Sequence, residues 1–115
     1  MSDWQPTIVT AAVNLAKNGT RDIVAAPGAT KSLWIYGLIG TTDAQGTILL
    51  LDSTPTSHSG VMPIAANGGF CMPISINPRA PWIKCASNTT FQATLSANSD
   101  FDGIVVYAIV EARHG

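Results

Sequence analysis

Turn residues divide this chain into short strand-forming runs, and that division constrains its fold more than any other feature. Nine runs rich in β-branched and aromatic residues are separated by loops that each contain Gly, Pro, Asn or Asp, and no apolar repeat of helical period continues beyond a turn or two. Runs spaced by roughly 8 to 12 residues are typical of an all-β sandwich or barrel. We therefore predict strands over residues 7–14, 21–25, 32–39, 47–52, 61–65, 70–75, 82–86, 91–96 and 103–111.

Length and charge limit the domain organisation and the partners. With 115 residues the chain has room for one core, so we predict an N-terminal arm over residues 1–6 and a single domain over residues 7–115. The net charge is −1 and Lys and Arg do not cluster, which argues against nucleic acid and an anionic membrane as partners. Only 11% of the residues are charged, against about 25% in soluble domains. We therefore expect small polar residues to keep part of the surface soluble and other subunits to bury another part of it.

The two cysteines are expected to be buried thiols. The chain starts with MSDWQPT, which has neither a basic nor an apolar segment, and no apolar run is long enough to span a bilayer. We therefore expect synthesis and folding in a cytoplasm, where Cys71 and Cys85 stay reduced. Two cysteines are too sparse a pattern for a metal site, and we expect no cofactor.

Several predicted strands are apolar on both faces. In residues 32–39, Leu33, Ile35 and Ile39 fall on one face by alternation, and Trp34, Tyr36 and Leu38 fall on the other. A two-layer sandwich buries one face of each sheet, so the second apolar face needs a further cover. Since the chain is short and shows no helical pattern, we expect a neighbouring subunit to supply it.

The stretch NGGFCMPISINPRAPW, residues 67–82, interrupts the strands with glycines and prolines. Asn67-Gly68-Gly69 can supply the positive φ of a tight turn, which predicts a hairpin or a corner there. Proline cannot donate a hydrogen bond within a β-ladder. Prolines at 63, 73, 78 and 81 therefore predict a path along sheet edges or between the sheets, which also blocks further strand addition.

The second half of the chain, SGVMPIAANGGFCMPISINPRAPWIKCASNTTFQATLSANSDFDGIVVYAIVEA, resembles small capsid decoration (cement) proteins of tailed bacteriophages. The likeness lies in Gly68, Gly69 and Phe70 followed by Pro73, a Trp-bearing strand at Trp82, the polar strand over residues 91–96, and a last strand that contains Gly103 and Tyr107.

This resemblance implies a single jelly-roll β-sandwich and a structural virion protein that carries out no catalysis. It implies a homotrimer on the outer capsid surface that binds the major capsid protein at threefold positions and stabilises the assembled shell. Longer family members carry an added receptor-binding or immunoglobulin-like module; we expect none in this chain, so the resemblance does not extend to a role in host adhesion. The predicted subunit or capsid interface comprises Trp4 on the arm together with Trp34, Tyr36, Leu38, Phe70, Met72 and Pro73, whereas Trp82, Phe91 and Phe101 are expected in the core.

Catalytic patterns in the sequence are weak. His58 stands among Thr56, Ser57 and Ser59, but a triad also needs an orienting carboxylate, so a polar loop is the simpler interpretation. Asp100 and Asp102 offer oxygen ligands of the kind Ca²⁺ binds, yet they fit a turn before a strand equally simply. The alternative function is a tail- or head-associated, lectin-like glycan-binding module. Few aromatic residues fall on the predicted loops, which counts against that alternative.

Overall fold

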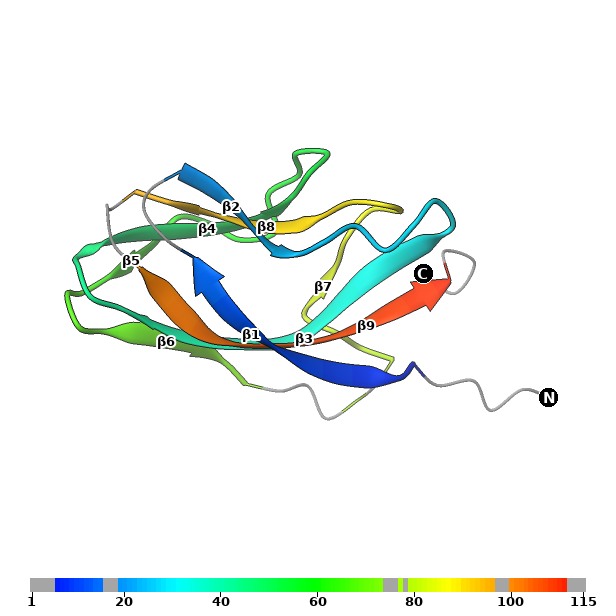
Figure 1. Cartoon of the computed structure of the whole chain (residues 1–115), viewed down its shortest axis with the longest axis horizontal. Helices are drawn as coiled ribbons and strands as arrows, with labels where there is room; N and C mark the ends of the chain where they lie inside the picture. The colour runs from blue at the N-terminus through cyan, green and yellow to red at the C-terminus, as the bar shows by residue number, and fades with distance from the viewer. Residues whose placement is uncertain (1–5, 16–18, 74–76, 78, 97–99, 112–115) are drawn as a thin grey trace.

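The computed structural model of the chain is a β-sandwich of nine strands (Figure 1). It describes residues 6–15, 19–73, 77, 79–96 and 100–111, and for Phe70 the backbone alone. The strands are β1 (Ile8–Leu15), β2 (Gly19–Val24), β3 (Lys31–Thr42), β4 (Gly46–Asp52), β5 (Met62–Ile64), β6 (Gly69–Met72), β7 (Ile83–Lys84), β8 (Phe91–Leu95) and β9 (Phe101–Glu111). Each predicted run overlaps one of these strands, so the nine strand predictions are confirmed with ends displaced by three residues or fewer.

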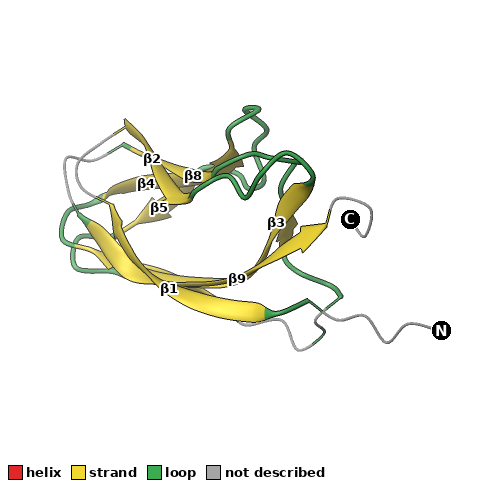
Figure 2. Ribbon diagram, turned by 45° about the vertical axis from the view of Figure 1, so that its right-hand side comes forward, coloured by secondary structure: helices red, strands yellow, loops and turns green. Residues whose placement is uncertain are grey.

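The two sheets have jelly-roll connectivity. One sheet has the order β1-β9-β3-β6, with β7 also paired to β3, and the other has the order β2-β8-β4-β5. All pairings are antiparallel, and the chain passes back and forth between the two layers visible in Figure 2. Two antiparallel sheets whose four-stranded paths are connected in this order form a jelly roll. The fold-class prediction is confirmed. No helix among the described residues is long and apolar enough to cross a membrane.

The main core lies between the two sheets. It is built from the inward-facing side chains of both layers, including Phe91 and Phe101, which are fully buried as predicted. Trp82 was also predicted in the core, and this is wrong because its side chain is 55% exposed. Trp82 instead anchors the edge of β3 through its backbone, donating its amide to the Ile35 carbonyl at 2.9 Å. Its indole Nε1 donates to the carbonyl of Pro73 at 2.6 Å.

A second, smaller core covers part of the outer face of the β1-β9-β3-β6 sheet. It contains Trp34 and Tyr36 of β3 and Val106, Ala108 and Val110 of β9. The Lys84 ammonium of β7 lies 4.5 Å from the centre of the Trp34 ring. The chain itself therefore buries Trp34 and Tyr36, and the expectation that a neighbouring subunit covers this face stays a prediction. The sequence pattern did not predict that β7, a strand of two residues, pairs with this edge of β3.

A β-bulge in β3 reverses which side chains face the core. The pairing of β3 with β9 shifts register between Ile35 and Gly37, so one extra residue, Tyr36, is inserted on β3. Beyond this point Leu38 points into the core and Ile39 points out, which is the opposite of the predicted faces. A one-residue insertion exchanges the faces of all the following residues because side chains alternate with a period of two.

The predicted turn at Asn67-Gly68-Gly69 is a corner between the sheets. β5 belongs to one sheet and β6 to the other, so the two strands do not form a hairpin. Asn67, with φ of 57°, adopts the left-handed conformation, and the Gly68 amide donates to the Ala65 carbonyl at 2.9 Å. Pro63 lies in β5, an edge strand of three residues, as the proline pattern predicts. Residue 78 lies outside the described residues.

Candidate functional site

Three of the five predicted interface residues whose side chains are described are buried in the single chain. Trp34 and Tyr36 are 2% and 0% exposed, and Leu38 lies in the main core. Burial raises the pKa of the Tyr36 phenol to about 12. Met72 is half-buried and Pro73 is exposed. Trp4 and the side chain of Phe70 lie outside the described residues, and the contribution of these seven positions to an interface stays a prediction.

The exposed apolar surface lies further along the same face. Ile39 of β3 and Ile104 of β9 are direct cross-strand partners and are 49% and 50% exposed. Cys71 of β6 is paired with Ile39 on its other side and is also exposed. They border a hollow of about 330 Å³ whose described lining carries no charge: Thr10, Gly37, Leu38, Ile39, Cys71, Met72, Ile104 and Val106. We call this surface the outer apolar hollow.

One end of the same sheet is acidic. A second hollow of about 330 Å³ is lined by Thr41, Thr42, Asp43, Asn67, Asp100 and Asp102. The Asp100 amide donates to a carboxylate oxygen of Asp43 at 3.1 Å, which supports the interpretation of Asp100 as a turn residue. Asp102 is already the second residue of β9, so it belongs to a strand and not to the preceding turn.

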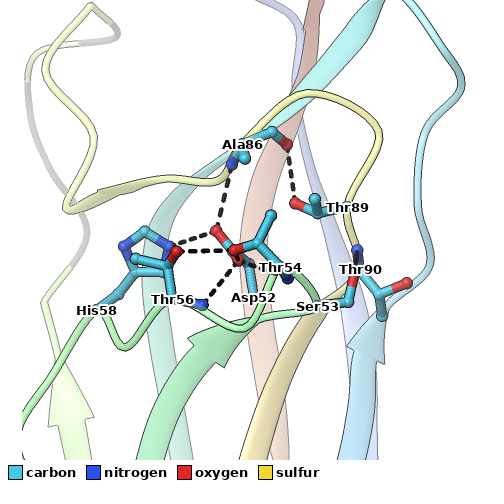
Figure 3. Close-up of polar contacts among 8 residues, drawn as sticks. All are labelled: Asp52, Ser53, Thr54, Thr56, His58, Ala86, Thr89 and Thr90. Carbon is cyan, nitrogen blue, oxygen red and sulfur yellow. Dashed lines mark hydrogen bonds and ion pairs between the residues drawn. The ribbon is translucent and has the colours of Figure 1, made fainter.

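The most elaborate polar cluster centres on Asp52, at the end of β4 (Figure 3). Its side chain is 1% exposed, and each carboxylate oxygen accepts several hydrogen bonds. Oδ1 accepts the backbone amides of Thr54 at 3.0 Å and Thr56 at 3.2 Å, as well as the Thr54 hydroxyl. Oδ2 lies 2.8 Å from His58 Nε2 and accepts the Ala86 amide at 3.3 Å. Asp52 thus ties the loop after β4 to the loop after β7.

Neighbouring hydrogen bonds join the same two loops. The Ser53 amide donates to the Thr90 carbonyl at 3.0 Å, and the Thr90 amide donates to Ser53 Oγ at 2.9 Å. The Thr89 hydroxyl donates to the Ala86 carbonyl at 2.8 Å. Ser59 is also engaged, because its Oγ accepts the Leu50 amide and donates to the Gly60 carbonyl. His58 therefore belongs to an ordered network and not to a free polar loop.

Cys85, which directly follows β7, completes this cluster. One ligand-type atom from each of Asp52, His58 and Cys85 lies within 4.8 Å of the other two. Cys85 is a free, buried thiol, as predicted, whereas Cys71, also free, is exposed and its predicted burial is wrong. Burial, and secondly the charge of Asp52, raise the pKa of the Cys85 thiol to about 12. A thiol held protonated is a poor nucleophile, which counts against cysteine catalysis here.

No known protein family, curated protein or solved structure matches the chain. Its function must therefore be argued from the outer apolar hollow and the Asp52 cluster. Sequence reasoning missed both. It treated His58 without its carboxylate partner, and it considered metal binding only at the two cysteines and at Asp100 and Asp102.

The Asp52 cluster predicts a specific acid sensitivity. Burial by itself raises the pKa of Asp52, but hydrogen bonds from the Thr54 and His58 side chains and from the Thr54 and Ala86 amides outweigh it and hold the pKa well below its usual range. A carboxylate whose pKa is lowered by folding stabilises the fold fully above its unfolded pKa of about 4, and this stability is lost as the pH falls towards the folded pKa. Asp52→Asn is therefore expected to flatten the loss of stability between about pH 4 and pH 2.

The same substitution should cost about 3 kcal/mol at pH 7, because the new amide group cannot accept the hydrogen bonds that Oδ2 accepts. Denaturant unfolding at several pH values, of the metal-free protein, measures both effects. The control Asp22→Asn alters an exposed carboxylate and should change stability at pH 7 by less than about 0.5 kcal/mol. If Asp52→Asn and Asp22→Asn lowered the free energy of unfolding equally, the hydrogen bonds of Asp52 would not stabilise the fold.

Proposed function

We propose that this chain is a structural virion protein that decorates the outer surface of a bacteriophage capsid as a homotrimer. Part of the support is the jelly-roll fold, with the connectivity expected from the resemblance of residues 59–112 to decoration proteins. A fold alone does not specify a function, so the proposal depends on a surface suited to protein contact.

The observation that carries the proposal is the outer apolar hollow. Exposed isoleucines side by side on two central strands, around an uncharged depression, are unusual on a protein surface that touches only water. Protein interfaces place such uncharged, apolar residues at their centres and surround them with polar residues. The acidic hollow at one end of the sheet, with Asp43 and Asp102, would form part of that polar border.

In this proposal a second copy of the chain covers the hollow, and the assembled trimer binds the major capsid protein. Each bound trimer stabilises the shell by mass action, as any ligand of a native state does. The chain carries out no chemical reaction in this role. It is made in the host cytoplasm and is located on the outside of the virion.

The test is a double variant that removes the apolar contact while preserving the sheet. Ile39→Glu with Ile104→Lys places opposite charges on direct cross-strand partners, a favourable pair in the monomer. Burying this pair in an interface would cost several kcal/mol, so we expect the trimer to dissociate. Sedimentation velocity measures the mass, and far-ultraviolet circular dichroism verifies the fold.

A matched control carries the same two charges on exposed residues that do not line the hollow, Val61→Glu with Ile109→Lys. This control is expected to retain the wild-type mass. A folded Ile39→Glu/Ile104→Lys protein that keeps the wild-type mass would exclude the outer apolar hollow as the interface.

Glycan binding is the second candidate, and the exposed indole of Trp82 favours it. Sugar rings stack on exposed aromatic faces, and Trp82 supplies one that the sequence interpretation had assigned to the core. A saccharide that binds the wild-type protein and fails to bind Trp82→Ala would place this function ahead of capsid decoration.

A further inference from the structure

We propose that Asp52, His58 and Cys85 form a binding site for Zn²⁺ or a chemically similar transition-metal ion. The inference is independent of capsid decoration. It starts from the geometry, since three different donor atoms, two from the end of β4 and the loop after it and one from the segment after β7, lie within 4.8 Å of one another. In tetrahedral zinc sites with these ligand types, neighbouring donor atoms are about 3.3–3.6 Å apart. Movements of roughly one ångström would therefore bring the three groups onto one ion.

The surroundings of Asp52 resemble the support that metal ligands require. Oδ1 is occupied by donors from Thr54 and Thr56, which fix the orientation of the carboxylate. Oδ2 faces His58 Nε2 at 2.8 Å and is free to exchange this hydrogen bond for a bond to the ion. Hydrogen bonds of this kind to a ligating carboxylate orient it and strengthen metal binding.

Charge balance also favours a divalent cation. Ionised Asp52 and a Cys85 thiolate would together place two negative charges in a buried site, which an ion of charge +2 neutralises. On binding, the Cys85 thiol loses its proton to solvent and the sulfur bonds to the ion. The Asp52–His58 hydrogen bond breaks, the proton that Nε2 donates to Asp52 is transferred through solvent to Nδ1, and Nε2 bonds to the ion. No oxidant or reductant is needed.

The three donor atoms determine which type of ion can bind, and they leave one of its four coordination positions open. Thiolate and imidazole ligands suit Zn²⁺ and Co²⁺, whereas Ca²⁺ and Mg²⁺ prefer oxygen ligands alone. The His58 side chain is 18% exposed, so water can reach the cluster and supply a fourth ligand. An ion at this position would join the loop after β4 to the segment after β7, where hydrogen bonds already connect them.

Titration of the purified full chain with Co²⁺ tests the site. A tetrahedral cobalt ion with a thiolate ligand gives a near-ultraviolet charge-transfer band and intense visible bands. We expect both bands to saturate at one ion per chain and to disappear when Zn²⁺ displaces Co²⁺. We also expect Zn²⁺ to raise the melting temperature by several degrees.

Variants distinguish this cluster from adventitious thiol binding. Cys85→Ser should abolish the charge-transfer band, and His58→Gln should weaken Co²⁺ binding at least tenfold. The matched control Cys71→Ser removes the exposed thiol on β6 and should retain wild-type bands and affinity. His58→Gln changes a partly exposed side chain, so it keeps the test valid if Cys85→Ser fails to fold. The proposal is overturned if the wild-type protein gives no charge-transfer band, if Cys71→Ser loses it, or if folded His58→Gln binds Co²⁺ with wild-type affinity.

Discussion

Gly103→Ala is expected to destabilise the domain by at least about 3 kcal/mol, a large part of the roughly 5–15 kcal/mol that separates folded from unfolded proteins. Gly103 lies in β9 directly opposite Gly40 of β3, the pair of strands at the centre of the sheet. A Cβ atom at position 103 would overlap the Ile39 carbonyl oxygen and lie 2.7 Å from the Gly40 Cα. Both are backbone atoms, so no side-chain rotation relieves the clash and the two strands must separate.

Denaturant unfolding of Gly103→Ala measures this loss, and Gly60→Ala is its matched control. A Cβ at Gly60 meets no atom within 4 Å, so the control should change the free energy of unfolding by less than about 0.5 kcal/mol. Equal stability of Gly103→Ala and Gly60→Ala would contradict the close approach of the β3 and β9 backbones at Gly103.

Trp34→Ala is expected to lower the free energy of unfolding by about 3–5 kcal/mol, the usual cost of deleting a buried aromatic side chain. Trp34 is buried by its own chain, against Tyr36 and the β9 side chains and beneath Lys84. The loss should therefore be the same at every protein concentration. An interface residue would behave differently, because its contribution to stability depends on the concentration of the partner.

Trp82→Ala is the matched control, since it removes the same side chain from an exposed position. It loses one hydrogen bond, from the indole to the Pro73 carbonyl, and should cost less than about 1.5 kcal/mol. Thermal and denaturant unfolding at two protein concentrations compare the variants. A Trp34→Ala protein with wild-type stability but weakened self-association would return Trp34 to the subunit interface.

The strand positions could be predicted because local chemistry determines them. Each run is closed by residues that break a β-ladder, so nine strands were recognisable without tertiary information. The two sheets could be expected for the same reason. The strand order could not, because pairings such as β1 with β9 join opposite ends of the chain.

Tertiary structure determines which side chains of β3 face the core and which residues meet in the Asp52 cluster. The bulge at Tyr36 adds one residue to a run that is apolar throughout, so composition does not reveal where the alternation breaks. The burial of Trp34 depends on the docking of β7 at the edge of β3. The approach of Cys85 to Asp52 and His58 requires two connecting loops to meet at one end of the sandwich. None of these contacts follows from a pattern within a single strand.

The proposed association of the outer sheet face with copies of the same chain can be measured through the mass of the protein in solution. Light scattering of the wild-type protein over a dilution series should give about 36 kDa, three times the chain mass of 12.0 kDa. A mass of 12.0 kDa at every concentration would contradict the trimer and leave the outer apolar hollow without its proposed partner.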